Sequence, residues 1–306
     1  MENRIDAKRF FTSRWGMVAT AVLCTLLWGS AVPCVKLGYE LFQVAGEDTA
    51  STLLFAGSRF ATAGAAVLLV DSLVHRRPAL PAQGCWWDVI RLGVVLTALQ
   101  YLFFYMGLSH TTGVKCSIVT SANTFLSVLV AHFFSVGDRL SVRKLMGCVV
   151  GFAGVVLINT AGGPIGAFNL RGDGFILMAA LMFAAGQLLN KKLAQQCSAS
   201  IATGGHLFIG GSILLVLGWV MGGQLHPVGW QAWLMLAYLI LISSVSFTLW
   251  SRLLQYNPVS KVLIFFFLNP IFGVLLSGAL LGEAFLSWQC VAALALVCGG
   301  IYIVNR

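Results

Sequence analysis

Ten long runs of apolar residues, separated by short polar segments, make up most of the chain. Each run is close to the ~20 residues that a helix needs to cross about 30 Å of hydrocarbon. The separating segments carry turn-forming or charged residues, for example His75-Arg76-Arg77-Pro78 and Gly222-Gly223. The pattern predicts ten transmembrane helices, near 16–38, 53–74, 86–108, 113–135, 142–159, 173–192, 200–221, 229–253, 259–281 and 286–304.

A loose internal repeat divides these runs into two groups of five. Residues 101–159 recur at 247–305 with an offset of 146, and a one-residue slip then aligns Gly137-Asp138 with Gly282-Glu283. We predict a leader at 1–15, a first five-helix repeat at 16–159, a linker at 160–172 and a second repeat at 173–306. The identical pairs are Leu108/Leu254, Lys115/Lys261, Ile118/Ile264, Asn123/Asn269, Val128/Val274 and Leu129/Leu275.

The basic residues predict how the helices cross the membrane. With a cytoplasmic N-terminus, the outer segments hold only Lys36, Lys115 and Arg171, and both termini lie inside. Five spans per repeat then give the two repeats opposite polarity, an arrangement typical of alternating-access transporters. The fold class that we predict is an all-α integral membrane protein, with ten transmembrane helices as two inverted five-helix repeats. The basic residues on the inner side are Arg4, Lys8, Arg9, Arg14, Arg76, Arg77, Arg91, Arg139, Arg143, Lys144, Lys191, Lys192, Arg252, Lys261 and Arg306.

Composition supports this class. Hydrophobic residues form 58% of the chain and charged residues 9%, whereas about a quarter of a soluble domain is charged. The net charge of +9 lies in short clusters between apolar runs, so it indicates membrane topology rather than nucleic-acid binding. We interpret the first run as a retained helix and expect a multi-pass protein of the cell (inner or plasma) membrane. The eight cysteines form no CxxC pair, which favours packing over metal or redox chemistry.

Several short motifs resemble a known family. They are Leu27-Trp28-Gly29-Ser30 with Pro33 and Lys36, Arg59-Phe60, Gly107-Leu108, Gly137-Asp138-Arg139-Leu140, Gly172-Asp173, Asn269-Pro270 and Gly282-Glu283. In order and spacing, the chain is similar to the drug/metabolite transporter superfamily, in particular to EamA-like ten-helix transporters such as the YddG-type amino-acid exporters. The resemblance implies export or exchange of a small metabolite. Thr124 replaces a proline expected in the fourth span, which predicts that this span lacks the kink of the ninth.

Two asparagines are the first candidates for substrate binding. Asn123 and Asn269 each lie eight residues beyond a lysine, Lys115 or Lys261, at the start of a span. At 1.5 Å per residue this places both amides close to the membrane midplane. They could offer donors and acceptors to a zwitterion or a sugar. The alternative is that they bond to neighbouring helices as packing contacts.

Polar and aromatic stripes supply the next candidates. Tyr101 and Tyr105 are four residues apart on one helix face, with Gln100 beside them. Aromatic rings with a polar tip suit a cavity wall, although packing or a lipid-facing belt would use the same residues. A second stripe lies in the eighth span and contains Ser243, Ser246 and Trp250.

Trp28 in the first span and Gln187 and Asn190 in the sixth complete the candidate ring. Arg59 lies well inside the second span, where an isolated guanidinium is costly. It could bind a substrate carboxylate or serve as a gate or ion-pair partner, and we favour a structural role. His206 is interpreted as a helix contact rather than a proton carrier.

The remaining patterns limit the mechanism. All ten acidic residues fall at span ends or in loops, which favours uncoupled transport or exchange over ion coupling. The sequence contains no P-loop and no HExxH, and it predicts no cofactor, metal site or catalytic residue. Gly147 and Gly151 have GxxxG spacing, which leaves packing within the chain or a homodimer open.

The sequence as a whole predicts a secondary transporter that exports or exchanges small metabolites, with amino acids as the favoured class. Its expected partners are a small-molecule substrate and the lipid bilayer. The alternative within the superfamily is a drug or nucleotide-sugar carrier. A membrane-embedded enzyme or a scaffold is disfavoured, because no nucleophile–base or metal-ligand set converges and the inverted duplication would be without purpose.

Overall fold

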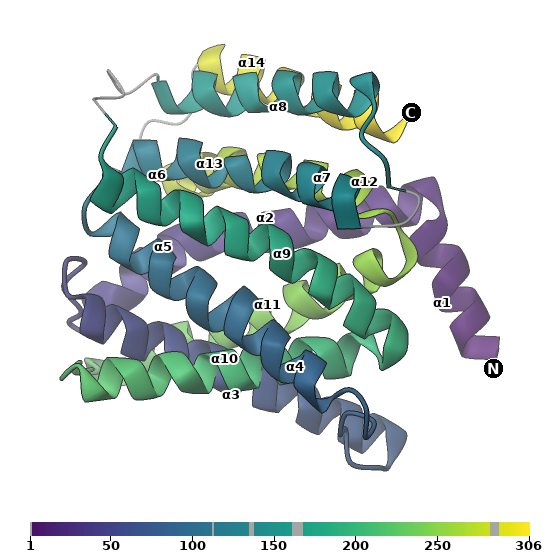
Figure 1. Ribbon diagram of the computed structural model, residues 1–306. Coiled ribbons are helices and arrows are strands. Elements are labelled where there is room, and N and C mark those ends of the chain that lie inside the picture. Colours follow the sequence, from purple (N-terminus) through teal and green to yellow (C-terminus); the bar gives the residue numbers. More distant parts are fainter. Residues whose placement is uncertain (1, 112, 135–137, 161–167, 282–287) are drawn as a thin grey trace.

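The computed structural model describes residues 2–111, 113–134, 138–160, 168–281 and 288–306, and every regular element in these ranges is helical (Figure 1). The repeat-motif residues Gly137, Gly282 and Glu283 and most of the predicted linker lie outside the described residues. In the first half the elements are α1 (Glu2–Thr12), α2 (Arg14–Leu41), α3 (Thr49–His75), α4 (Trp86–Leu92), η1 (Gly93–Leu99), α5 (Gln100–Leu108), α6 (Gly113–Thr120), α7 (Ala122–Phe134) and α8 (Val142–Thr160). In the second half they are η2 (Leu170–Gly174), α9 (Phe175–Gln196), α10 (Ala199–Val220), α11 (Gly229–Tyr256), α12 (Val259–Leu263), η3 (Ile264–Phe267), α13 (Leu268–Leu281) and α14 (Trp288–Asn305).

The predicted spans are found within a few residues of their expected positions. Nine helical stretches among the described residues are long and apolar enough to cross a membrane, and the remaining predicted span, the fourth, is divided into α6 and α7. Spans 1, 2, 5, 7, 8 and 10 are the single helices α2, α3, α8, α10, α11 and α14. Spans 3, 4, 6 and 9 are composite: α4–η1–α5, α6–α7, η2–α9 and α12–η3–α13.

The helices begin where side chains can satisfy their first N–H groups. The carboxylate of Asp48 accepts from the backbone N–H of Ala50 and Ser51 at the start of α3. The Ser198 hydroxyl does the same for Ile201 at the start of α10. The leader is itself helical, which the sequence did not predict.

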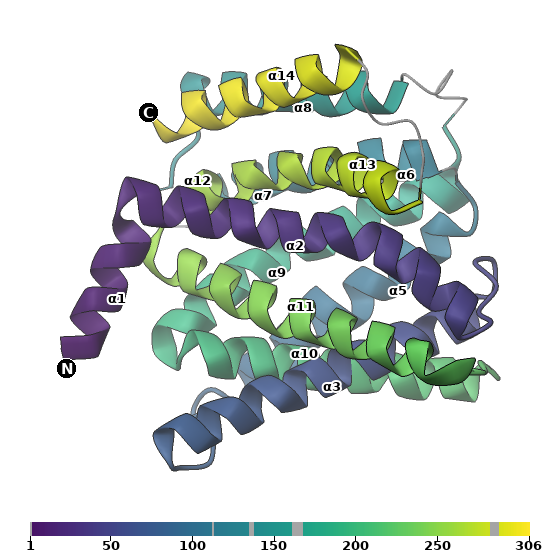
Figure 2. The same ribbon diagram turned by 180° about the vertical axis from the view of Figure 1, so that it is seen from behind.

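The first helix of each repeat packs against helices of the other repeat. Span 1 packs against spans 8 and 9, and its counterpart, span 6, packs against spans 3 and 4. Spans 2 and 7 pack against each other, as do spans 5 and 10 (Figures 1 and 2). Spans 1 and 6 also run in opposite directions. These relationships confirm the inverted five-helix repeats.

Glycines allow two of these helix pairs to approach closely. A Cβ on Gly57 or Gly211 would collide with backbone atoms across the interface of spans 2 and 7. A Cβ on Gly147 would lie 2.8 Å from the Gly300 carbonyl oxygen, so the GxxxG pair joins α8 to α14 within the chain. A homodimer gains no support from this motif and stays a prediction.

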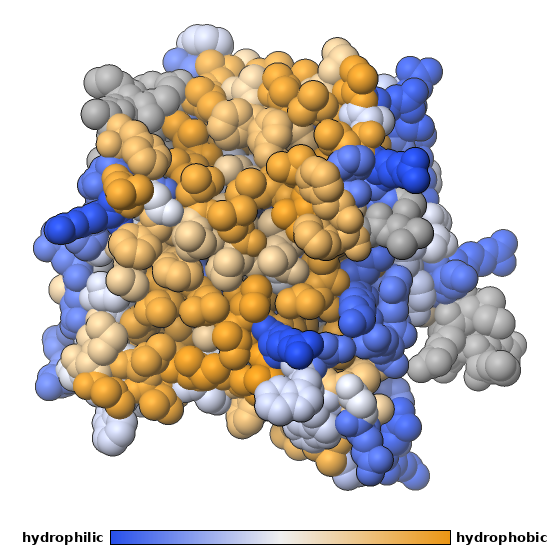
Figure 3. Space-filling model, in the orientation of Figure 1, coloured by the Kyte–Doolittle hydropathy of each residue, from blue (hydrophilic) through white to orange (hydrophobic). Residues whose placement is uncertain are grey.

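The surface has the form of a membrane protein. Apolar side chains gather over the middle of the helices, and polar side chains gather at the two ends (Figure 3). Both termini lie at the same end, which we call the terminal face; the opposite end is the distal face (Figure 1). Large apolar side chains such as Leu73, Trp219 and Val220 are exposed, as expected for contact with lipid.

Candidate functional site

Spans 4 and 9 are both interrupted, and they touch each other at the interruptions. Span 4 breaks at Ser121, and span 9 narrows to a 3-10 turn at Ile264–Phe267; the repeat offset aligns Ser121 with Phe267. The Thr124 hydroxyl donates to the Leu263 carbonyl oxygen over 3.3 Å. Broken helices that meet in this way form the substrate sites of many inverted-repeat transporters.

Span 4 is therefore interrupted although Thr124 stands where a proline was expected. The backbone N–H of Ser121 bonds to the Ile118 carbonyl and that of Thr124 to the Ser121 carbonyl, so each bond spans three residues. Such tight turns interrupt an α-helix without proline. The two halves are thus alike at this point even though only span 9 contains Pro270.

The two candidate asparagines follow the breaks directly. Asn123 is 6% exposed, and its Oδ1 atom has no hydrogen-bond partner among the described residues. The Oδ1 atom of Asn269 is buried and lacks a described partner as well. A buried carbonyl oxygen without a partner costs about 1–3 kcal/mol, and no packing contact among the described residues satisfies these two acceptors.

Aromatic rings from four spans form a cluster beside the break in span 9. The ring of Trp28 stacks on Phe266 of η3 with centroids 5.1 Å apart, and it meets Trp250 edge-on at 5.0 Å. Phe183 of span 6 meets Phe266 at 4.8 Å, and Phe247 of span 8 meets Trp28 at 5.2 Å. We call these five residues the aromatic cluster.

The aromatic cluster carries two indole donors with different partners. The Nε1–H group of Trp250 donates to Gln187 Oε1 over 3.3 Å. The Nε1 atom of Trp28 is buried and has no partner in the described part of the chain. Buried tryptophan N–H groups usually find an acceptor, so the Trp28 group is an unsatisfied donor in the described structure.

A second group of polar side chains surrounds Arg59, which is 6% exposed in span 2. Its Nε atom donates to Ser243 Oγ over 2.8 Å, and its guanidinium lies 4.9 Å from the centroid of the Phe60 ring. Tyr101 of span 3 packs against the Phe60 ring, and the Tyr105 ring stacks 6.0 Å from that of Tyr101. The sequence had identified all of these except Phe60 as separate candidates, and the fold brings them together.

The two groups are joined by aromatic contacts. The Phe60 ring lies 4.5 Å from Tyr101 and 6.3 Å from Phe247, which belongs to the aromatic cluster. A nearly continuous aromatic path therefore runs from Trp28 to Tyr105.

Two other candidates, Asn190 and Ser246, form hydrogen bonds within the helix bundle, and a third, Gln100, is partly accessible. Asn190 exchanges hydrogen bonds with Ser251, whose hydroxyl also lies 2.7 Å from Thr203 Oγ1, and all three side chains are buried. Ser246 donates to the Ile242 carbonyl of its own helix. Gln100 is partly accessible at the start of α5 and has no hydrogen-bond partner among the residues described.

His206 is fully buried in span 7. Its Nδ1 atom lies 2.9 Å from Thr97 Oγ1 in span 3, which is the contact expected of a helix-packing histidine. Its ring also meets Phe247 edge-on at 5.8 Å.

Near the terminal face, Asp138 connects the two repeats. Its carboxylate accepts from the backbone N–H of Ser260 at 2.9 Å, from the Ser260 hydroxyl and from Lys144 Nζ at 2.5 Å. Burial raises the pKa of this carboxyl, but the hydrogen bonds from Lys144 and Ser260 outweigh burial, and the pKa lies below its ordinary value. The loop after span 4 thereby holds the first turn of span 9.

Asp173 has a similar position near the distal face. It accepts from the Thr111 hydroxyl at 2.7 Å and from the Asn169 backbone N–H at 2.7 Å. It thus connects the end of span 3 to the start of span 6.

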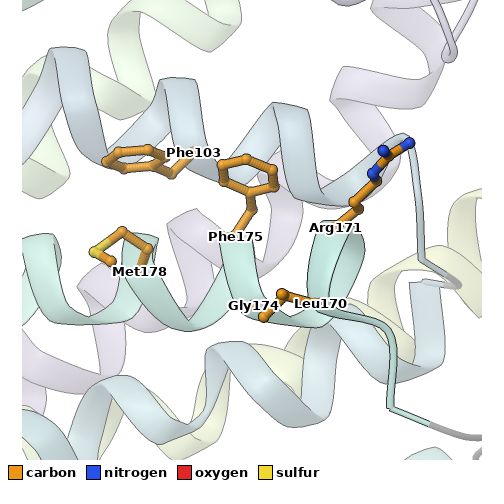
Figure 4. Close-up of a pocket in the computed structure, with 6 residues that line it drawn as sticks. All are labelled: Phe103, Leu170, Arg171, Gly174, Phe175 and Met178. Carbon is orange, nitrogen blue, oxygen red and sulfur yellow. The ribbon is translucent and has the colours of Figure 1, made fainter.

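A groove of about 330 Å³ lies between spans 3 and 6 near the distal face (Figure 4). Phe103 and Phe175 form its floor with stacked rings, and Arg171 points away from them at one end. Its wall residues Leu170 and Met178 are 76% and 40% exposed, so the groove opens to the outer surface of the bundle. It is separate from the residues around Arg59 and Trp28.

The sequence profile of the EamA-like transporter family matches residues 15–160 and again residues 170–306. The chain belongs to the EamA-like transporter family. The two matches cover both groups of five spans. It is accordingly a membrane transporter with many passes through the bilayer.

Curated relatives of this EamA-like transporter are distant but cover most of its length. A WAT1-related chloroplastic protein of Arabidopsis thaliana is 26% identical over 91% of this chain, which spans 66% of that relative. An uncharacterized transporter of Archaeoglobus fulgidus is 26% identical over 85% of this chain and 88% of its own length. A probable amino-acid metabolite efflux pump of Salmonella typhimurium is 23% identical over 92% of each chain.

A solved structure shares the fold. It superposes with a TM-score of 0.74 over 96% of this chain and 98% of its own, at 19% sequence identity.

Some residues of the region were missed by sequence reasoning. Phe266 reads as part of an apolar run, because nothing in that run signals the 3-10 turn that exposes it to Trp28. Tyr39, which lies near Arg59, stands close to the end of span 1, a position that the sequence alone places at the membrane interface. Phe247 did carry a signal, since the repeat offset aligns it with Tyr101.

Proposed function

We propose that this EamA-like transporter exports or exchanges small metabolites across the cell membrane by alternating access, with amino acids as the favoured substrate class. The observation that carries the proposal is the meeting of two broken spans, with an unpartnered asparagine carbonyl oxygen after each break. The substrate would bind between the repeats, against the aromatic cluster and the Arg59 group. The probable amino-acid metabolite efflux pump among the relatives supports this substrate class.

The terminal face is cytoplasmic in this proposal. Most basic residues of the short connecting segments lie at this end, and such residues are retained on the cytoplasmic side. Both termini are then inside the cell. An inverted repeat allows the same contacts to form alternately at the two faces.

The hydrogen bonds near the terminal face would seal the site from the cytoplasm. Asp138 ties span 4 to span 9, and the Asn190–Ser251–Thr203 network joins spans 6, 7 and 8. Opening towards the cytoplasm would require these bonds to break. Asp173 and Thr111 would act in the corresponding way at the distal face.

Transport without an ion gradient fits the distribution of acidic groups. The two buried carboxylates in the described part of the chain, Asp138 and Asp173, cap helix ends and are already hydrogen-bonded. Proton- or sodium-coupled carriers usually keep a carboxylate at mid-membrane. Solute exchange or facilitated diffusion would therefore set the direction of flux by the solute gradients.

Counterflow in proteoliposomes tests the proposal. Purified protein is reconstituted into vesicles loaded with an unlabelled amino acid, and entry of the labelled amino acid is measured. We expect Asn123→Ala and Asn269→Ala each to reduce counterflow about tenfold, as loss of one hydrogen bond to a charged ligand group would.

Asn159→Ala is the matched control, because the one hydrogen bond described for this amide goes to the Val155 carbonyl of its own helix. It should retain wild-type counterflow. Normal counterflow in both site variants would remove the asparagines from the site. A wild-type protein that exchanges none of a broad amino-acid panel would refute the substrate class.

A further inference from the structure

Arg59 is unusual among the basic residues of this chain. It is the one arginine or lysine that is buried in the described part of the chain, and it lies ten residues beyond Thr49, the first residue of span 2. At 1.5 Å per residue its Cα atom is about 15 Å from the helix start, close to the midplane of the bilayer. A charge at this depth requires a compensating partner.

The surrounding residues do not supply that partner. No carboxylate among the described residues lies within 4 Å of the guanidinium, and the one side-chain hydrogen bond described for it is from Nε to Ser243 Oγ. Glu40, which follows Tyr39 near the end of span 1, is exposed. The outer nitrogens of a guanidinium form the fork that binds a carboxylate, and here that fork has no described partner.

The neighbours of Arg59 are suited to an anion. Tyr101 and Tyr105 come from span 3, and Tyr39 of span 1 lies beside Tyr105. The Tyr101 ring lies 4.5 Å from Phe60, whose ring faces the Arg59 guanidinium, and 6.0 Å from the Tyr105 ring. A phenol group can donate one hydrogen bond to an oxygen anion, and the Tyr39 hydroxyl also lies within hydrogen-bonding reach of Tyr105. Tyr101 packs within the bundle, but part of its surface remains accessible. The residues around Arg59 are therefore not completely enclosed by other side chains.

We propose that Arg59, with Tyr39, Tyr101 and Tyr105, forms an anion subsite that binds the carboxylate of the transported solute. This inference rests on the proposed function, because it names the chemical group that the transport site recognises. One positive charge balances one carboxylate, whereas a phosphate dianion would leave a net negative charge in the membrane interior. The aromatic path from Phe60 to Trp28 then receives the apolar part of the same solute.

Three matched solutes separate the carboxylate from the rest of the ligand. L-phenylalanine has both a carboxylate and an ammonium group, 3-phenylpropionate lacks the ammonium group, and phenethylamine lacks the carboxylate. Binding to detergent-purified protein is measured by the ligand-dependent rise of the melting temperature. We expect the wild type to bind both carboxylates at least about tenfold more tightly than phenethylamine.

The Arg59→Gln variant should lose this preference, and Arg59→Lys should keep part of it because the charge remains. Arg171→Gln is the matched control, since Arg171 is an exposed arginine near the distal face that lies outside the subsite. It should bind all three solutes as the wild type does. Equal binding of phenethylamine and L-phenylalanine by the wild type would overturn the subsite, and so would an unchanged preference in Arg59→Gln.

A measurement on the unmutated protein covers the case in which Arg59→Gln does not fold. Phenylglyoxal modifies accessible arginines, and peptide mass spectrometry reads the extent of modification at Arg59. Protection by 3-phenylpropionate but not by phenethylamine is the expected result. Equal protection by both, or none by either, would overturn the proposal.

Counterflow of L-phenylalanine distinguishes failure of the subsite from failure of the proposed function. Carboxylate binding that depends on Arg59, without counterflow by the wild type, would keep the subsite and refute transport of this solute. Counterflow that persists in Arg59→Gln, with an unchanged preference among the three solutes, would keep transport and refute the subsite.

Discussion

The hydroxyl of Thr124 donates to the carbonyl oxygen of Leu263 across the point where spans 4 and 9 meet. The donor belongs to the first repeat and the acceptor to the second. Leu263 ends α12 immediately before the 3-10 turn, so its carbonyl is one of those that a regular helix would have used. This bond joins the two interruptions to each other.

Replacing Thr124 by valine tests that connection. Thr124→Val keeps the shape of the side chain but removes the donor, which leaves a buried carbonyl without its partner. We expect the free energy of unfolding to fall by about 1–3 kcal/mol and counterflow to fall with it. Thermal unfolding and proteoliposome counterflow check the two effects.

Thr25→Val is the control for Thr124→Val. Thr25 is also fully buried, but its hydroxyl bonds to the Ala21 carbonyl of its own helix. We expect near wild-type counterflow from this variant. If both variants lose flux equally, the contact between the broken spans has no special role.

Loss of the Asp138 carboxylate should destabilise the terminal face. Asp138→Asn removes the ion pair with Lys144 and one acceptor for Ser260, a loss of about 1.5–3 kcal/mol for hydrogen bonds to a charged group. Thermal unfolding at neutral pH should show the difference from wild type. Asp88→Asn is the control, because Asp88 is more exposed and its pairs with Arg91 and Lys192 are long, at 3.7 and 3.8 Å.

The same carboxylate predicts a dependence on pH. Because its pKa in the folded protein lies below the ordinary 3.8, its contribution is complete above that value. It is lost as the pH falls through the folded-state pKa. The gap in stability between wild type and Asp138→Asn should therefore stay constant as the pH falls to 3.8 and close only at lower pH, and a gap that already closes at mildly acidic pH would contradict this account.

Two adjacent glycines in span 10 allow a test of how α14 packs on α8. A Cβ on Gly300 would lie 2.5 Å from the Gly147 carbonyl oxygen and 2.8 Å from the Gly151 nitrogen, whereas one on Gly299 would have its nearest neighbour at 3.9 Å. Gly300→Ala should destabilise the protein by about 1–3 kcal/mol, as overpacking does, and Gly299→Ala should not. Thermal unfolding measures the stability of the two variants, and size-exclusion chromatography measures their oligomeric state. A change of oligomeric state in Gly300→Ala without loss of stability would instead favour a dimer contact.

The sequence predicted the spans well because each apolar run has a length fixed by the bilayer. It predicted the inverted arrangement because the basic residues and the repeat agree. It could not predict the break at Ser121, since tight turns there depend on contact with span 9 rather than on a local breaker such as proline. Span 4 is therefore interrupted even though Thr124 stands in place of a proline.

Single side chains were harder to place than helices. Asn190 and Trp250 were both proposed as site residues from their positions along a predicted helix. In the structure, Asn190 forms hydrogen bonds with Ser251, whereas Trp250 belongs to the aromatic cluster. Which of two polar residues faces a site depends on rotations of whole helices that a single sequence does not encode. The sequence favoured a structural role for Arg59, which would require an acidic residue as an ion-pair partner. The described neighbours of Arg59 contain no acidic residue.

The partners of α2 have a consequence for how the chain is made. Apart from α1, this first span packs against α11 and α13, and α11 begins only at Gly229. During synthesis α2 therefore enters the bilayer long before α11 and α13 are made. Until then Trp28 has lipid rather than these helices as its neighbour. The apolar composition of α2 keeps the helix stable in lipid during this time. A chain cut after the first repeat would insert into the membrane, but its first helix would lack the helices that it packs against. The two halves should therefore form a native core only when both are produced in the same cell.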